Sequence, residues 1–366
     1  MDYSHGVLQS MCSPFFPQLR EQLGPFLVDK TKLIEKLVDN GLNGDVDLVL
    51  RPRRCGKTTT LLMLNSFFGI PQNDDPHALF RGLYITSNHD LCQEHMGKYA
   101  VIFCDFKNIT GKSWEEMFSS FRGMVSNLYK EFYEYLGHSL NPGEKEFFES
   151  IRLNTASVEC WGNSLEQLSR FLARKSGRGV MVFIDEYETP YNYAYEFGFF
   201  AKANDFLRRN ELSALLKSNA NLEYALLAGV TPVTKPGWYS GLNNIETHAL
   251  HQRNSKFAGM VMFTETEVLQ LITLSKCELE LEDLKAHYST VPTSLLVISV
   301  YTIPYPSCLP WRNPQSRIFG SRQANSLYHT EVFRGMFLPS ISLRGFCLML
   351  MFPLNLRIVS PLTSRH

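Results

Sequence analysis

Residues 51–58 read R-P-R-R-C-G-K-T, and they follow directly on the apolar run V-D-L-V-L at 46–50. A stretch of helical character, residues 59–68, comes immediately after them. A loop between a strand and a helix N-terminus suits an anion, because unpaired backbone N–H groups and the positive end of the helix dipole point at it. The stretch therefore predicts a phosphate-binding loop in which Lys57 reaches the β- and γ-phosphates and Thr58 holds Mg²⁺ through its hydroxyl.

The loop departs from the usual pattern, G-x-x-x-x-G-K-[ST], at its first position. Gly56, Lys57 and Thr58 match the pattern, but Arg51 stands where the first glycine is expected. Pro52 disfavours helical backbone at the residue before it, so we expect Arg51 to be the last residue of the strand. Read alone, these residues also fit a basic turn that caps an ordinary helix.

The residues around the lysine complete the predicted cofactor-binding set. Two arginines flank the loop and can pair bidentately with phosphate oxygens, although they fit solvated surface charges equally well. The predicted nucleotide-binding residues are Arg53, Arg54, Cys55, Gly56, Lys57, Thr58 and Thr59.

Two carboxylates emerge at the end of a second apolar run. Residues 180–184 read V-M-V-F-I, and Asp185 and Glu186 follow them. An aspartate at this place in a P-loop ATPase helps to hold Mg²⁺, and the glutamate after it can accept the proton of an attacking water. We therefore predict that Asp185 and Thr58 bind the metal ion and that Glu186 is catalytic. Taken alone, D-E-Y-E also fits a solvated acidic turn.

Thr231 follows another apolar run, Y-A-L-L-A-G-V at 224–230. A hydroxyl at that point can touch the γ-phosphate or position a water molecule, so Thr231 joins Glu186 and Lys57 as a candidate catalytic residue. The alternative is a threonine that merely begins a proline-containing turn.

Apolar runs and helical segments alternate along the chain. Strands alternating with helices predict a parallel α/β sheet covered on both faces, here the three-layer sandwich of P-loop NTPases. Ligands of such sheets bind at the carboxyl ends of the strands, and the spacing from Lys57 to Asp185 fits one strand inserted between their strands. The predicted strands are 46–51, 99–106, 180–184, 224–230 and 245–250; the predicted helices include 113–136 and a long one at 196–218, and 70–98 reads as an irregular connection.

Composition excludes several classes of protein. The 366 residues are 44% hydrophobic with a formal net charge of zero, so no overall charge favours nucleic acid or an anionic membrane. Eight cysteines without a C-x-x-C pair predict reduced thiols rather than disulfides or zinc ligands. No signal peptide and no apolar stretch of about 18 residues is evident, so we expect an intracellular protein, cytoplasmic or nuclear.

Together these motifs resemble the AAA-ATPase-like family, a divergent group of P-loop ATPases. Its members carry R-P-R-R-F-G-K-[ST] and D-E-Y-D, against R-P-R-R-C-G-K-T and D-E-Y-E here. Their F-V-D-K-T near the start is similar to F-L-V-D-K-T, and their F-S-G-L-N-N and F-T-E-x-E-V to Y-S-G-L-N-N and F-T-E-T-E-V. These matches lie at 26–31, 239–244 and 263–268, and the resemblance runs from residue 14 to 289.

The resemblance implies ATP binding and Mg²⁺-dependent hydrolysis, coupled to a conformational or partner-binding step. It also implies that arginine at this position of the loop is a common feature of the family. Pro232 and Val233 depart from the family's T-G-V-x-R-V-S-K run, which favours an alternative function as a nucleotide-dependent interaction module with negligible turnover. The expected partners are ATP and an unidentified protein, with neither nucleic acid nor membrane. An oligomer stays open, with Arg208 and Arg209 as candidate arginine fingers.

The sequence suggests three parts. Residues 14–250 form the predicted ATPase core, 251–290 a helical extension, and 291–366 an atypical tail of low order. That tail holds seven arginines, no lysine and a single acidic residue, Glu331. This composition fits a separate basic segment. It also fits translated intron or out-of-frame sequence, and we favour this second interpretation. Transcript reads that continue in this frame across codon 290 would contradict it.

Overall fold

The computed structural model describes most of the chain up to residue 275. All the described residues lie in the first of two units of the chain, Met1–Ser299. Arg54 and the predicted tail lie outside them, so the predicted order of the tail and its boundary stay predictions. The described residues are 15–53, 55–71, 75–217, 219–233, 242–250, 252, 254–275 and 281.

Five parallel strands form one sheet in the order β2-β3-β4-β1-β5. This confirms the predicted α/β class, and the strand that lies between β1 and β3 is β4. The connections that leave β1, β3 and β4 therefore begin side by side at one edge of the sheet. The strands are β1 (Asp45–Leu50), β2 (Val101–Asp105), β3 (Val180–Asp185), β4 (Leu222–Gly229) and β5 (Ile245–His248).

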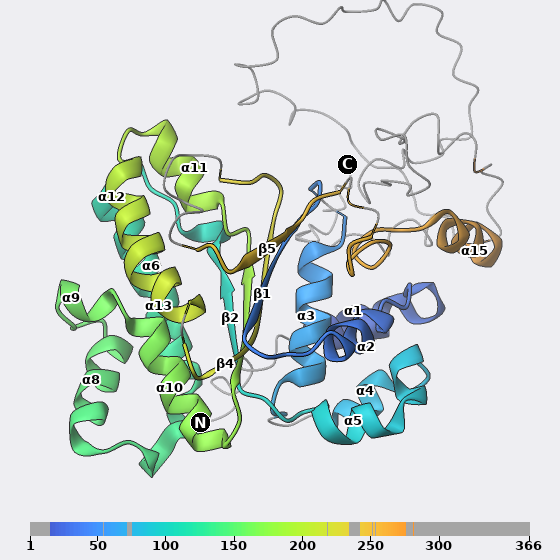
Figure 1. Ribbon diagram of the computed structural model, residues 1–366, viewed down its shortest axis with the longest axis horizontal. Helices are drawn as coiled ribbons and strands as arrows, with labels where there is room; N and C mark the ends of the chain where they lie inside the picture. Colours follow the sequence, from blue (N-terminus) through green and yellow to red (C-terminus); the bar gives the residue numbers. More distant parts are fainter. Residues whose placement is uncertain are drawn as a thin grey trace, which may run out of the picture. The chain divides into compact units, whose positions relative to one another are not determined.

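Helices cover both faces of this sheet, as Figure 1 shows. One face carries α1 (Phe15–Leu23), α2 (Lys32–Asp39), α3 (Lys57–Phe68), α4 (Pro76–Phe80) and α5 (His89–His95). The other carries α6 (Trp114–Glu131), α7 (Tyr133–Leu136), α8 (Pro142–Arg152), α9 (Val158–Trp161), α10 (Ser164–Ser176), α11 (Thr189–Glu196), α12 (Phe200–Asn204) and α13 (Ser213–Leu216). Short 3₁₀ turns are η1 (Gly24–Phe26), η2 (Tyr84–Ser87), η3 (Phe106–Asn108) and η4 (Gly137–Ser139), and α15 (Glu265–Ser275) follows the sheet.

Burial on both faces explains why the strands read as continuous apolar runs. In β1, Leu48 points into the core under α6 and α10, whereas Val49 points into the core under α3. In β3 every residue from Val180 to Asp185 is buried. The sheet is thus a rigid platform, and its carboxyl edge holds the connections after β1, β3 and β4.

Two predictions of secondary structure were wrong. The stretch 196–218 is not one helix, because the chain turns at Gly198, whose φ is +82°, before α12 begins. It then forms a π-helical segment, η5 (Asp205–Leu212), in which the buried Glu211 accepts hydrogen bonds from Ser164 and caps α10. The stretch 70–98 is not irregular, since the side chains of Asp75 and Asn88 cap α4 and α5.

Within the described part of the chain, no helix combines the length and the apolar character needed to cross a membrane.

Candidate functional site

The strand before the loop ends one residue earlier than predicted. β1 ends at Leu50 and not at Arg51, although the N–H of Arg51 still donates to the carbonyl of Gly229 on β4, at 3.0 Å. Gly56 precedes α3 with φ of +89°, a conformation that residues with a Cβ avoid. The first turn of the twelve-residue α3 thus opens toward the loop with its unpaired N–H groups.

Lys57 lies inside the curve of its own loop. The side chain is only 5% exposed, and its ammonium donates to the carbonyls of Arg51, at 3.3 Å, and Pro52, at 3.0 Å. An ammonium in this place can exchange backbone carbonyls for phosphate oxygens by moving only its last bonds. The loop geometry therefore suits the predicted contact between Lys57 and a phosphate group.

Thr58 and Asp185 join the two predicted motifs directly. The Thr58 hydroxyl donates to Asp185 Oδ2 at 2.5 Å, across the end of β4. One residue opens α3 and the other ends β3, so the parallel order of the sheet brings them together. A hydroxyl and a carboxylate supply the oxygen ligands that Mg²⁺ prefers.

Burial shapes the acid chemistry of Asp185. Removal from water, together with the charges of Asp105 and Glu186, raises the pKa of this carboxyl to about 6, although the hydrogen bond from Thr58 acts in the opposite direction. Asp105, which pairs with Asp185 in the ladder of β2 and β3, is exposed and caps η3. A divalent cation would offset this cost of ionisation, which is the behaviour expected of a metal ligand.

Glu186 turns the chain sharply at the end of β3. Its φ is +51°, in the left-handed region that non-glycine residues seldom adopt. Its N–H donates to Asp185 Oδ1 at 3.0 Å, so the turn folds back on the Asp185 carboxylate. Such backbone conformations cost about 1 kcal/mol or more and gather at functional sites.

The remaining predicted site residues occupy varied positions. Arg53 is exposed at the loop surface, Thr59 is half-buried, and Arg54 lies outside the described residues. Cys55 packs into the core under α3, where burial raises the pKa of its thiol. Thr231 is exposed just beyond β4, with its carbonyl accepting a hydrogen bond from Tyr187. The structure thus brings Lys57, Thr58, Asp185 and Glu186 to one edge of the sheet.

Arg51 has a structural role that the motif did not predict. Its guanidinium is buried at 3% exposure and donates to the carbonyls of Leu50, at 2.8 Å, and His248, at 2.7 Å. The side chain therefore fastens the start of the loop to the end of β5. The sequence feature that could have indicated this role is the arginine at a position where phosphate-binding loops usually have glycine.

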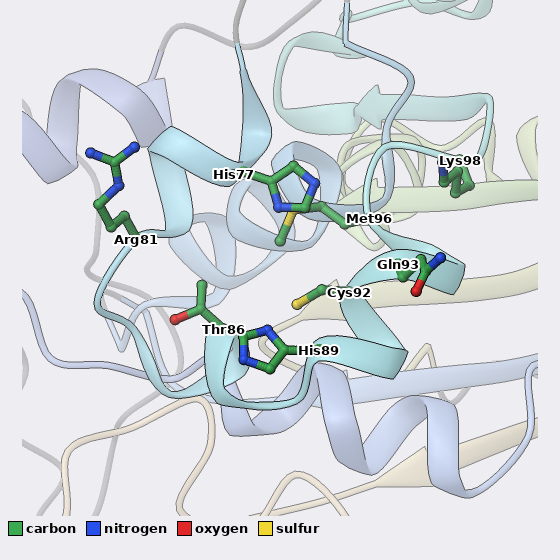
Figure 2. Close-up of a pocket in the computed structure, with 8 residues that line it drawn as sticks. All are labelled: His77, Arg81, Thr86, His89, Cys92, Gln93, Met96 and Lys98. Carbon is green, nitrogen blue, oxygen red and sulfur yellow. The ribbon is translucent and has the colours of Figure 1, made fainter.

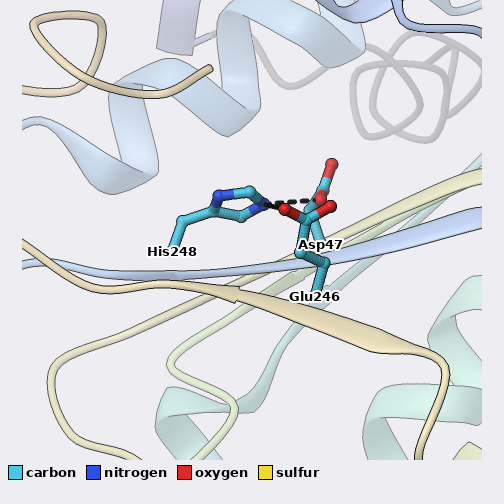
Figure 3. Close-up of side chains that lie close together, drawn as sticks. All are labelled: Asp47, Glu246 and His248. Atoms are coloured by element: carbon cyan, nitrogen blue, oxygen red, sulfur yellow. Dashed lines mark hydrogen bonds and ion pairs between the residues drawn. The ribbon is translucent and has the colours of Figure 1, made fainter. Parts of the chain in front are cut away.

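A buried polar network joins side chains of β1, β4 and β5, and Figure 3 shows Asp47, Glu246 and His248 in it. Asp47 on β1 is 1% exposed and accepts hydrogen bonds from Tyr224, at 2.5 Å, and His248, at 2.7 Å, and it pairs with Lys256 at 2.6 Å. Ligand atoms of Asp47, Glu246 and His248 all lie within 4.8 Å of one another. The Lys256 ammonium already supplies the cation here, so we interpret the cluster as an ion-pair network rather than a metal site.

The network should control stability rather than chemistry. Burial by itself would raise the pKa of Asp47, but hydrogen bonds from His248, Lys256 and Tyr224 outweigh it and lower the pKa. Asp47→Asn should therefore reduce the free energy of unfolding at pH 7 by about 3 kcal/mol, because it leaves the largely covered Lys256 ammonium without its counter-charge. Urea unfolding measures the loss, with the exposed neighbour on β1, Asp45→Asn, as control.

The pH dependence of this effect has a definite sign. A carboxyl whose pKa is lowered by folding stabilises the protein above its ordinary range, near pH 4, and loses that contribution as the pH falls through the lowered value. The gap between wild type and Asp47→Asn should therefore shrink as the pH falls below about 4. Equal stability of wild type, Asp47→Asn and Asp45→Asn at pH 7 would contradict this account of the network.

A cavity of about 450 Å³ lies elsewhere, on α4, η2 and α5 (Figure 2). Figure 2 shows Arg81 and Lys98 at opposite ends and the imidazoles of His77 and His89 between them. None of the predicted site residues lines this cavity, so it is separate from the phosphate loop. Its lining is His77, Arg81, Thr86, His89, Cys92, Gln93, Met96 and Lys98.

The fold and the edge of its sheet define the P-loop NTPase class of α/β protein: a parallel sheet with β4 between β1 and β3, a G-K-T helix start and an acidic pair at the end of β3. The family model described as "Predicted AAA-ATPase" matches residues 14–238. The chain belongs to this family.

A curated relative matches a longer stretch. The chain is 26% identical over 276 residues to a protein described as "Uncharacterized protein in vnfD 5′region", from Azotobacter chroococcum mcd 1. The match covers 75% of this chain and 46% of the relative, so the chain spans about half the length of the curated protein it resembles.

Proposed function

We propose that this protein binds ATP with Mg²⁺ at the carboxyl edge of its sheet and hydrolyses it. The observation that supports this most directly is the 2.5 Å contact between the Thr58 hydroxyl and Asp185 Oδ2. Two motifs far apart in sequence, each suggestive alone, supply adjoining oxygen atoms at the N-terminus of α3. A basic turn that only capped a helix would not need a buried carboxylate beside its threonine.

Each residue has a distinct role in this proposal. The N–H groups of the first turn of α3 and the Lys57 ammonium bind the phosphates and stabilise the charge that develops on them. Thr58 and Asp185 would hold Mg²⁺, which neutralises phosphate charge when bound. Glu186, held by its turn beside Asp185, accepts the proton of the attacking water. The adenine base and a coupled conformational or partner-binding step are proposed from family membership.

The proposal predicts that the Asp185 carboxylate destabilises the folded chain but is needed to bind Mg²⁺. Folding raises the pKa of this carboxyl from about 4 to about 6. As the pH rises through this interval, the unfolded state ionises more readily than the folded state, so the free energy of unfolding falls. Without nucleotide, Asp185→Asn should therefore be more stable than wild type at pH 8, by about 1 to 2 kcal/mol. Urea unfolding at pH 8 measures the gain.

The same variant should respond differently to pH and to ligand. Its advantage should fall by about half at pH 5, where the folded carboxyl is largely protonated in wild type. It should also lose the stabilisation that ATP with Mg²⁺ confers. A wild type at least as stable as Asp185→Asn at both pH values would show that the buried carboxylate carries no such cost.

Phosphate release from the full chain tests hydrolysis itself. We expect steady-state release from ATP in Mg²⁺ that disappears in EDTA and in a Lys57→Met protein. Release equal to that of Lys57→Met would refute turnover. If ATP still bound in that case, the alternative function as a nucleotide-dependent interaction module would stand, which Pro232 and Val233 in place of the family's arginine-containing run favour.

A further inference from the structure

The last two residues of the acidic turn, Tyr187 and Glu188, reach across to the end of β4. Tyr187 is fully buried, and its N–H donates to the carbonyl of Ala228 at 3.2 Å. Its hydroxyl donates to the carbonyl of Thr231 at 2.9 Å and accepts from the N–H of Val233 at 3.2 Å. One side chain therefore bonds to both sides of the turn that follows β4.

Glu188 makes a second contact with the same segment. It is 3% exposed, and its Oε1 accepts the N–H of Val230 at 2.7 Å. Its Oε2 is buried and makes no hydrogen bond to any residue that the structure describes. Burial raises the pKa of this carboxyl. A buried acid with one oxygen on a backbone amide is suited to fixing that amide in place.

Gly229 shows how closely the two segments pack. A Cβ atom at this position would lie 2.5 Å from Tyr187 Cε1, 2.7 Å from Tyr187 Cδ1 and closer still to Glu188 Oε2. No side chain other than hydrogen fits there without displacing one of the two residues. The end of β4 thus rests directly on the turn that carries Asp185 and Glu186.

We propose that Tyr187 and Glu188 are positioning residues, which clamp residues 230–233 to the acidic turn and so fix the separation between the Glu186 carboxylate and the Thr231 hydroxyl. The proposal rests on the proposed ATP hydrolysis at this edge. Through the clamp, movement of the acidic turn on binding or release of phosphate moves residues 230–233 with it. A proton acceptor for the attacking water and a polar group that contacts the phosphate lose efficiency when their separation changes by about 1 Å.

Tyr187→Phe tests the clamp with minimal disturbance, because the ring stays in the core and only the hydroxyl is lost. We expect kcat for ATP hydrolysis to fall on the order of 10- to 100-fold, with KM within about 3-fold of wild type. Tyr129→Phe is the matched control: its buried hydroxyl also donates to a backbone carbonyl, of Ser164 at 2.6 Å, but on α6 and α10. That control should leave kcat unchanged, although it too loses one buried hydrogen bond.

Two substitutions of Glu188 distinguish a positioning role from an acid–base role. Glu188→Gln keeps an oxygen for the Val230 amide and should retain kcat within about 3-fold, whereas Glu188→Ala should lower it on the order of 10-fold. A Gln variant as impaired as the Ala variant would overturn the positioning role, since the lost property would then be the charge.

Amide hydrogen exchange without nucleotide tests the clamp independently of turnover. Tyr187→Phe should speed exchange at Val233, and Glu188→Ala at Val230, by about 10-fold, while Tyr129→Phe should change neither. If wild type shows no Mg²⁺-dependent hydrolysis, the proposed function fails and exchange alone decides the clamp. Unchanged exchange at Val233 in Tyr187→Phe, or an equal fall in kcat in Tyr129→Phe, overturns the inference.

Discussion

Replacing Lys57 with methionine should remove most of the affinity for ATP. The ammonium lies inside the loop, where it can meet phosphate oxygens, and methionine keeps the buried aliphatic length while losing the charge. A lost hydrogen bond to a charged group costs about 2 kcal/mol, or roughly a 30-fold weaker Kd. The measurement is the rise in melting temperature that ATP and Mg²⁺ produce by mass action, which should largely disappear in the variant.

A matched substitution guards against a general loss of folding. Lys145→Met, at an exposed lysine on α8, removes the same charge far from the loop and should leave the ATP-induced rise intact. An undiminished rise in Lys57→Met would mean that the ammonium does not contact the phosphates. The loop would then be only a basic turn at the start of α3.

Glu186→Gln should separate binding from hydrolysis. The amide fills the same volume and keeps the turn after β3, but it cannot accept the proton of water. General-base catalysis contributes about 100-fold or more, so phosphate release should fall at least that far while ATP binds with unchanged or tighter affinity. Single-turnover hydrolysis and a binding titration on the same preparation measure the two effects separately.

The control for this substitution lies ten residues further on. Glu196→Gln, at the exposed end of α11, removes a carboxylate of the same kind outside the turn and should hydrolyse ATP at the wild-type rate. If Glu186→Gln hydrolysed ATP as fast as wild type, another group would have to accept the proton. The strained backbone at Glu186 would then need a different explanation.

The sequence predicted the fold and the elements that carry the site. Lys57 and Asp185 follow apolar runs, and the carboxyl ends of parallel strands meet at one edge, so their proximity followed from strand order. What pattern alone could not give was the direct contact of Thr58 with Asp185, because hydrogen-bond geometry depends on the twist and packing of three neighbouring strands.

The buried polar contacts escaped prediction for a different reason. The partners of Arg51 and Asp47 lie near the far end of the described chain, at His248 and Lys256, and no local periodicity relates them. The Asp47 side chain did interrupt an apolar run, which is the signal that it needed a buried partner. The break in the helix predicted over 196–218 had a local signal in Gly198, whereas the π-helical segment after it is tied to a tertiary contact, Glu211 capping α10.

A calorimetric titration of ATP into the full chain, with and without Mg²⁺, tests the central claim most directly. The account predicts one site per chain in Mg²⁺. It predicts markedly weaker binding in EDTA, because Thr58 and Asp185 then meet phosphate without a cation between them, and weaker binding than wild type also in Lys57→Met. Binding that is absent in Mg²⁺, or that is as strong in EDTA and in Lys57→Met as it is for wild type in Mg²⁺, would contradict the assignment of this edge of the sheet as a site for ATP and Mg²⁺.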